Sequence, residues 1–213
     1  MVASLAILSL FVVAMIAARV LYTGSWEHVA IAWNLVLAWI PFALAVVAYD
    51  RPRSGVTSPP LLVTAALWLL FLPNAPYIVT DLMHVRSGGP VPVLYDVLLL
   101  SAAAWTGLLL GLTSLYLMHS VARRVLGPAT AWALAVGALA LSSFGIYLGR
   151  VQRWNSWDVF TRPGALVSEV GAGILHPLSH PRPIALTVLL TSFLLASYLV
   201  FYALARLNAL VDE

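Results

Sequence analysis

The chain has 213 residues, of which 62% are hydrophobic and 9% charged, with a formal net charge of +3 and no cysteine. Soluble domains carry about 25% charged residues, so this composition excludes a water-compatible surface and predicts a protein of the lipid bilayer, with no role in nucleic-acid binding. The lack of cysteine excludes disulfides, thiolate nucleophiles and cysteine-bound metal.

Long apolar runs predict about six transmembrane helices, since one span needs roughly 20 apolar residues. We expect spans near residues 2–22, 29–49, 59–84, 94–119, 128–148 and 184–205. The predicted fold class is therefore all-α, a polytopic transmembrane helix bundle that forms a single domain over residues 1–213. The expected location is the cell membrane, with the lipid bilayer as the main partner.

The third span contains the unusual sequence FLPNAPYIVTDLMH, from Phe71 to His84. Its first part, residues 59–72, would be about 21 Å long as a helix, which is short of the ~30 Å hydrocarbon core. The span must therefore continue through a break at Pro73 and Pro76. Each proline removes a backbone donor, so carbonyls such as that of Leu72 are expected to lose their helical partners. A broken helix of this kind lines binding sites in transporters, and a simple packing kink is the alternative.

Polar and small residues share faces on two other spans. Asn34 and Pro41 are seven residues apart on one helix face, which indicates a face that meets protein. Asp96 lies on the stripe that contains Gly107, and Gly107 with Gly111 forms a GxxxG pair that lets another helix approach closely. We therefore expect Asp96 to point into the bundle, because an acid facing lipid would cost about 3 kcal/mol.

Topology predicts one polar cluster at one membrane face. Spans 3 and 5 run in the same direction and span 4 runs back, so the ends of spans 3 and 5 and the start of span 4 lie on the same side. The arginine count is nearly balanced between the two sides, and discounting functional arginines favours the N-terminus inside and the cluster outside. The clustered residues are Asp81, His84, Asp96, Arg150, Arg153, Asn155 and Asp158.

The acids and the histidine of this cluster suit metal chemistry. Asp81 and His84 are three residues apart on one helix face, so both reach one point, as a divalent metal requires. Asp96 would complete the metal site, and Asp158 would join these three as a catalytic residue. Such a site polarises a carbonyl or phosphoryl oxygen or activates water.

The other polar residues suit an anionic substrate. Arg150 and Arg153 offer forked donors for phosphate or carboxylate, and Asn74, Tyr77 and Asn155 would add further substrate contacts. A metal-dependent hydrolase or transferase acting on an anionic lipid-like substrate is one reading. A small transporter is another, although span 1 has almost no polar residues. The leading interpretation is a structural or ligand-binding role, because the charges can neutralise one another.

Four sequence blocks resemble a known family. They are WNLVLAWIP (Trp33–Pro41), FLPNAPYIVTDLMH, Tyr95-Asp96 and GIYLGRVQRWNSWD (Gly145–Asp158). Together they are similar to the bacterial family of integral membrane proteins called domain of unknown function 1361. The family pattern has an aromatic residue where this chain has Val151. The resemblance implies a polytopic membrane protein and adds no activity, substrate or cofactor.

Overall fold

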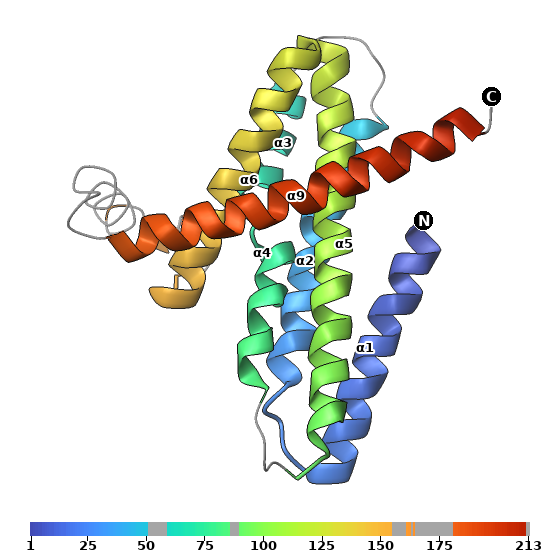
Figure 1. Cartoon of the computed structure of the whole chain (residues 1–213), viewed down its shortest axis with the longest axis vertical. Helices are drawn as coiled ribbons and strands as arrows, with labels where there is room; N and C mark the ends of the chain where they lie inside the picture. The colour runs from blue at the N-terminus through green and yellow to red at the C-terminus, as the bar shows by residue number, and fades with distance from the viewer. Residues whose placement is uncertain (51–58, 86–89, 155–160, 163, 165–180, 212–213) are drawn as a thin grey trace. The chain divides into compact units, whose positions relative to one another are not determined.

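The computed structural model describes residues 1–50, 59–85, 90–154, 161–162, 164 and 181–211 (Figure 1). These residues form helices and short connections, without a strand among them. Among the described residues, six segments are long and apolar enough to cross a membrane: Val2–Thr23, Val29–Tyr49, Pro59–His84, Val93–Leu126, Pro128–Val151 and Pro183–Leu207. The all-helical fold class and the six spans are thereby confirmed, and the chain is a multi-pass membrane protein.

The helices form two compact units, Met1–Val121 and Ala122–Glu213, each described here by itself. The prediction of a single domain stays a prediction. The first unit contains α1 (Val2–Thr23), α2 (Val29–Tyr49), α3 (Pro59–Phe71), α4 (Asn74–Tyr77), the 3₁₀ helix η1 (Ile78–His84) and most of α5 (Val93–Leu126). The second unit contains the end of α5, α6 (Pro128–Val151) and α9 (Pro181–Val211).

The third span is interrupted at the two prolines, as predicted, but it bends only slightly. The Leu72 carbonyl does not lose its partner, because it accepts a tighter three-residue bond from the Ala75 N–H at 3.2 Å. The Asn74 side-chain amide donates to the Phe71 carbonyl at 2.9 Å. Local polar groups therefore satisfy carbonyls that the break would leave exposed at membrane depth.

The GxxxG pair of α5 receives the broken part of the third span. A Cβ atom at Gly107 would lie 2.5 Å from the Ala75 carbonyl oxygen, and one at Gly111 would lie 3.2 Å from the Ala75 Cβ. At Gly107 only glycine allows this approach, because real Cβ atoms essentially never lie within 3.0 Å of another atom, whereas a Cβ at Gly111 would be tight but not excluded. The prediction that the glycines admit another helix is confirmed, and that helix is α4.

One buried hydrogen-bond chain ties α2, α3 and α5 together. The Trp68 indole N–H donates to the Ser114 hydroxyl at 2.6 Å, and that hydroxyl donates to the Pro41 carbonyl at 3.4 Å. Trp68 and Ser114 are both buried. Pro41 is fully buried as well, so the face of α2 that carries it meets protein, as predicted.

The second unit is held by aromatic packing between α6 and α9. Trp132 of α6 makes edge contacts with Tyr198 and Tyr202 of α9, at ring-centroid distances of 5.9 and 5.0 Å. The Tyr202 hydroxyl accepts a hydrogen bond from Arg123 at 2.8 Å, and the Arg206 guanidinium lies over the Tyr202 ring. Apolar bodies thus fill the helix contact while the polar tips pair with arginine.

Candidate functional site

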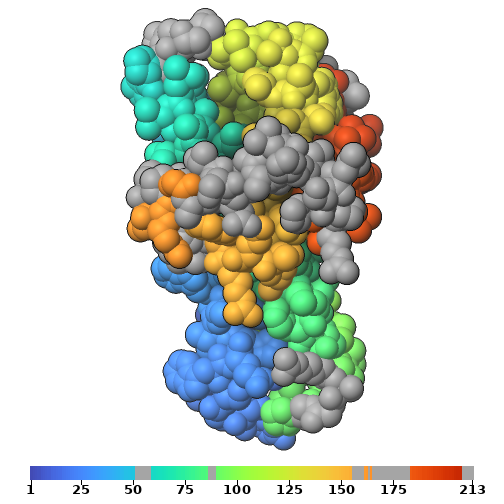
Figure 2. Space-filling view, turned by 90° about the vertical axis from the view of Figure 1, so that its left-hand side faces the viewer, coloured from blue at the N-terminus to red at the C-terminus, as the bar shows by residue number. Residues whose placement is uncertain are grey.

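Polar residues of the first unit gather at one of its ends. There α1 ends, α2 begins, η1 ends and α5 begins, so four helix termini share the lower end in Figure 1. Figure 2 shows the blue first helices and the green segments beside one another at this end. We call it the polar end of the first unit, defined by Arg19, Glu27, His28, Asn34, Asp81, His84 and Asp96.

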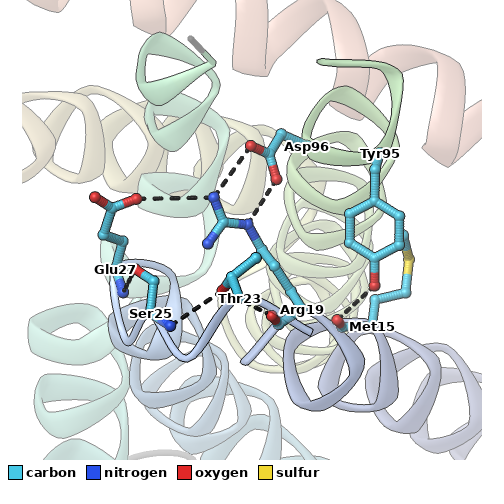
Figure 3. A network of polar contacts seen from close by, with 7 residues as sticks. All are labelled: Met15, Arg19, Thr23, Ser25, Glu27, Tyr95 and Asp96. Carbon is cyan, nitrogen blue, oxygen red and sulfur yellow. Dashed lines mark hydrogen bonds and ion pairs between the residues drawn. The ribbon is translucent and has the colours of Figure 1, made fainter. Parts of the chain in front are cut away.

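A buried ion pair between α1 and α5 forms its centre (Figure 3). Arg19 donates from Nε and Nη2 to the two carboxylate oxygens of Asp96, at 2.8 and 3.3 Å. The side chains are 3% and 7% exposed. The neighbouring Tyr95 hydroxyl donates to the Met15 carbonyl at 2.7 Å, which fixes the start of α5 against α1. Asp96 therefore points into the bundle, as predicted.

The Arg19 guanidinium has donors beyond those that Asp96 uses. Nη2 also lies 3.7 Å from the carboxylate of Glu27, whose side chain is 65% exposed. Nη1 is buried and has no hydrogen-bond partner among the described residues. A guanidinium has five N–H groups in a fixed fork, so a bidentate carboxylate occupies only part of it.

His28 lies beside this ion pair, immediately before α2. Its side chain is buried, and neither ring nitrogen has a partner among the described residues. Burial lowers the pKa of His28, and the Arg19 charge lowers it further, while the negative charges of Asp96 and Glu27 act against this. The imidazole is therefore neutral at pH 7, with one N–H donor and one acceptor nitrogen.

The second polar group joins η1 to α2. The Asn34 amide donates to the Asp81 carboxylate at 3.3 Å, and the His84 Nδ1 atom lies 3.8 Å from its other oxygen. Residues three apart eclipse one another in a 3₁₀ helix, so Asp81 and His84 lie on one face of η1. Asp81 is 8% exposed and His84 48% exposed, so the pair runs from the interior toward water.

The three residues of the predicted metal set fall into two groups. Asp96 bonds Arg19 with both oxygens, whereas Asp81 and His84 face each other. Among the described residues no three acidic or histidine side chains are close enough to hold a metal ion. A metal bound by all three would have to draw Asp96 away from Arg19. The metal set stays a prediction, which elemental analysis of the wild type and His84→Ala tests.

The other predicted site residues belong to the second unit, to α4 or to the part of the chain outside the described residues. Arg150 and Arg153 belong to the second unit, at the end of α6, where Arg153 has a left-handed backbone with φ of 60°. Asn155 and Asp158 lie outside the described residues. Asn74 and Tyr77 lie in α4, at the proline break. The single shared cluster and these residues' roles in binding stay predictions.

Sequence reasoning missed four members of the polar end. The sequence pattern predicts Asn34 only as a packing residue, and the predicted cluster does not contain Arg19, Glu27 or His28. The alternating direction of successive spans is a signal for these residues. It puts the end of span 1 on the same side as the end of span 3 and the start of span 4. An arginine inside an apolar run is also a signal, because such charges usually face the bundle interior and pair with other polar groups.

Comparison with known proteins identifies one family. The model of the family described as "Protein of unknown function (DUF1361)" matches residues 33–198, which is most of the chain. This match confirms the resemblance inferred from the four sequence blocks. No curated protein and no solved structure is significantly similar to the chain.

Proposed function

The chain belongs to the DUF1361 family of proteins of unknown function, and on that premise we propose that it is a ligand-binding membrane protein whose site is the polar end of the first unit. We place it in the cell membrane, a location consistent with its six apolar spans. The alternative is that these residues form a purely structural ion-pair network.

One observation supports ligand binding over a structural network. Three buried nitrogens, Nη1 of Arg19 and both ring nitrogens of His28, have no partner among the described residues. Each buried polar atom without a partner costs about 1 to 3 kcal/mol. A network that serves only stability satisfies its own members, and buried polar groups without a protein partner are rare. The polar atoms of a ligand would provide the partners that these nitrogens lack.

The exposed neighbours of the buried groups also support the proposal. Glu27 beside Arg19 is 65% exposed, and His84 beside Asp81 is 48% exposed. Arg19 and Asp81 thus each have an exposed polar neighbour, so the buried groups lie next to the surface of the first unit.

The test is ligand retention by detergent-purified protein. Native mass spectrometry and a thermal-shift screen of polar metabolites and lipids are applied to the wild type, to His28→Phe and to Trp26→Phe. His28→Phe removes both ring nitrogens, whereas Trp26 is exposed and its variant is the control. We expect a retained molecule or a stabilising compound for the wild type and the control, with at least tenfold weaker binding by His28→Phe.

A structural role predicts a different result. The wild type would then retain no molecule and respond to no compound, and His28→Phe would be as stable as the wild type or more stable, because it replaces two buried polar atoms without partners by an apolar ring. That combination would contradict the proposed function.

A further inference from the structure

We infer that the ligand carries a monoanionic oxyanion, a phosphodiester or a carboxylate, that binds the Arg19 guanidinium at the position now taken by the Glu27 carboxylate. This inference rests on the proposed function and names the ligand class of the same site.

Donors outnumber acceptors among the buried groups without partners. Nη1 of Arg19 carries two N–H groups and a neutral His28 carries one, against a single acceptor nitrogen on His28. A ligand that satisfies this set must present mainly acceptor atoms. The planar fork of a guanidinium matches the paired oxygens of a carboxylate or phosphate, and such charge-assisted bonds are about twice as strong as neutral ones.

The two acidic neighbours of Arg19 are held very differently. Asp96 is buried and makes two bonds at 2.8 and 3.3 Å. Glu27 is exposed and lies 3.7 Å from the Arg19 guanidinium, and an ion pair with one solvent-exposed partner at that distance is weak. Glu27 therefore marks a place where a second negative charge is tolerated but only weakly bound. A ligand anion can displace it without disturbing the Arg19–Asp96 pair.

Charge balance limits the ligand to one negative charge. With Glu27 in place, Arg19 faces two carboxylates, and exchanging Glu27 for a monoanion leaves the local charge unchanged. A dianion such as a phosphate monoester would add a further negative charge beside buried Asp96, which the low-dielectric interior disfavours. A phosphodiester or a carboxylate therefore fits better than a phosphomonoester.

The test compares Glu27→Gln with Asp50→Asn. Both remove one exposed acid from the chain, but Asp50 caps the far end of α2. The probes are nanodiscs containing phosphatidylglycerol, nanodiscs of phosphatidylcholine alone, and soluble dimethyl phosphate and acetate. We expect Glu27→Gln to bind an anionic probe up to about fivefold more tightly than the wild type, because a weak competitor has gone. Asp50→Asn should bind like the wild type.

The source of the oxyanion is read from the same data. Retention of phosphatidylglycerol that dimethyl phosphate and acetate do not compete away assigns a lipid headgroup, whereas binding of either soluble probe assigns a free small molecule. Arg19→Gln should abolish binding in both cases. Because that variant leaves Asp96 buried without its cation and can fail to fold, the gain of affinity in Glu27→Gln carries the test.

Two results overturn the inference and differ from failure of the proposed function. The first is a wild-type ligand that is uncharged or cationic and whose binding Glu27→Gln weakens. The second is anionic binding that is equal in Glu27→Gln and the wild type. In both results the protein still binds a ligand, so the proposed function stands. If the wild type retains no molecule of any class, the proposed function itself fails.

Discussion

Arg19 is a buried charge in an apolar span of the first unit. A charged side chain that is 3% exposed survives in an apolar span only because Asp96 neutralises it with two hydrogen bonds. Removing one partner strands the other, whereas removing both leaves an ordinary apolar contact. The pair is therefore coupled, and its energy appears only when both residues are changed together.

We predict that Asp96→Leu and Arg19→Leu each lower the free energy of unfolding by about 3 to 5 kcal/mol, because each leaves a buried charge uncompensated. The double variant Arg19→Leu/Asp96→Leu should recover most of that loss. Unfolding of detergent-purified protein measures the four stabilities, and Glu27→Gln, which removes only an exposed and weak contact, should change stability by less than about 1 kcal/mol. Additive losses in the double variant would show that the pair is not coupled.

His28 predicts a pH dependence of stability. Burial, together with Arg19 and His84, lowers the pKa of His28 against the opposing effect of Asp96 and Glu27. In the unfolded state the His28 side chain has a pKa of about 6.5, so it binds a proton below that pH. In the folded state His28 stays neutral to a lower pH. Stability contributed by neutral His28 is therefore fully present above pH ~6.5 and is lost as the pH falls toward the lower folded pKa.

Unfolding of the wild type and of His28→Gln between pH 7.5 and about 5 measures this effect. The wild type should lose more stability over that range than the variant, which lacks the titrating group. His84 is present in both proteins, so the difference between them isolates His28. Parallel pH profiles would contradict the lowered pKa.

At the scale of the elements, the broken third span and the glycines of α5 form one packing unit. At the break, the Ala75 carbonyl oxygen lies only 2.5 Å from the position that a Cβ atom at Gly107 would take. The close contact between α4 and α5 therefore needs a glycine at position 107. The Asn74 amide satisfies the Phe71 carbonyl at the same break. Proline break and glycine pair thus depend on each other.

We predict that Gly107→Ala lowers the free energy of unfolding by about 1 to 3 kcal/mol, because its new Cβ would lie 2.5 Å from a backbone oxygen that cannot move freely. Gly137→Ala in α6 is the matched control, since nothing lies within 4 Å of its Cβ position and alanine is the better helix former by about 1 kcal/mol. Thermal unfolding should separate the two variants in opposite directions. Equal stabilities would show that α4 and α5 do not approach so closely.

At the scale of the whole molecule, the described residues contain six segments that are long and apolar enough to cross a membrane. The orientation favoured by the arginine distribution puts the N-terminus inside and the polar end of the first unit outside. The turn between α1 and α2 then faces out and the residue after α2 faces in. The chain has no cysteine, so a single introduced cysteine reports its side without a background signal.

We predict that an impermeant thiol reagent labels Trp26→Cys in intact cells, whereas Asp50→Cys is labelled only after the membrane is made permeable. Both positions are exposed and lie at opposite ends of α2, so accessibility within the protein does not distinguish them. The reverse pattern would place the polar end in the cytoplasm and would move the expected ligand to that side.

Local features of the sequence were enough to predict the spans and several faces within them. Apolar length set the helix boundaries, and the predicted range 29–49 is the observed α2. Spacing along a single helix predicts the inward face of Asp96 and the shared face of Asp81 and His84, because helical periodicity relates residues that are close in sequence. The break at Pro73 is likewise a local property of the sequence. The burial of Asp96 and the closeness of Asp81 to His84 are both confirmed.

The partners of those polar residues could not be read in the same way. Arg19 and Asp96 are 77 residues apart and Asn34 and Asp81 are 47 apart, so their contacts depend on which helices become neighbours. Hydrophobicity alone selects a span but does not choose its neighbour, because one apolar face packs against another with little preference. Folding brings α1 beside α5, so that Asp96 pairs with Arg19, while Asp81 contacts Asn34 and His84. The site therefore follows from helix packing, whereas the spans follow from composition.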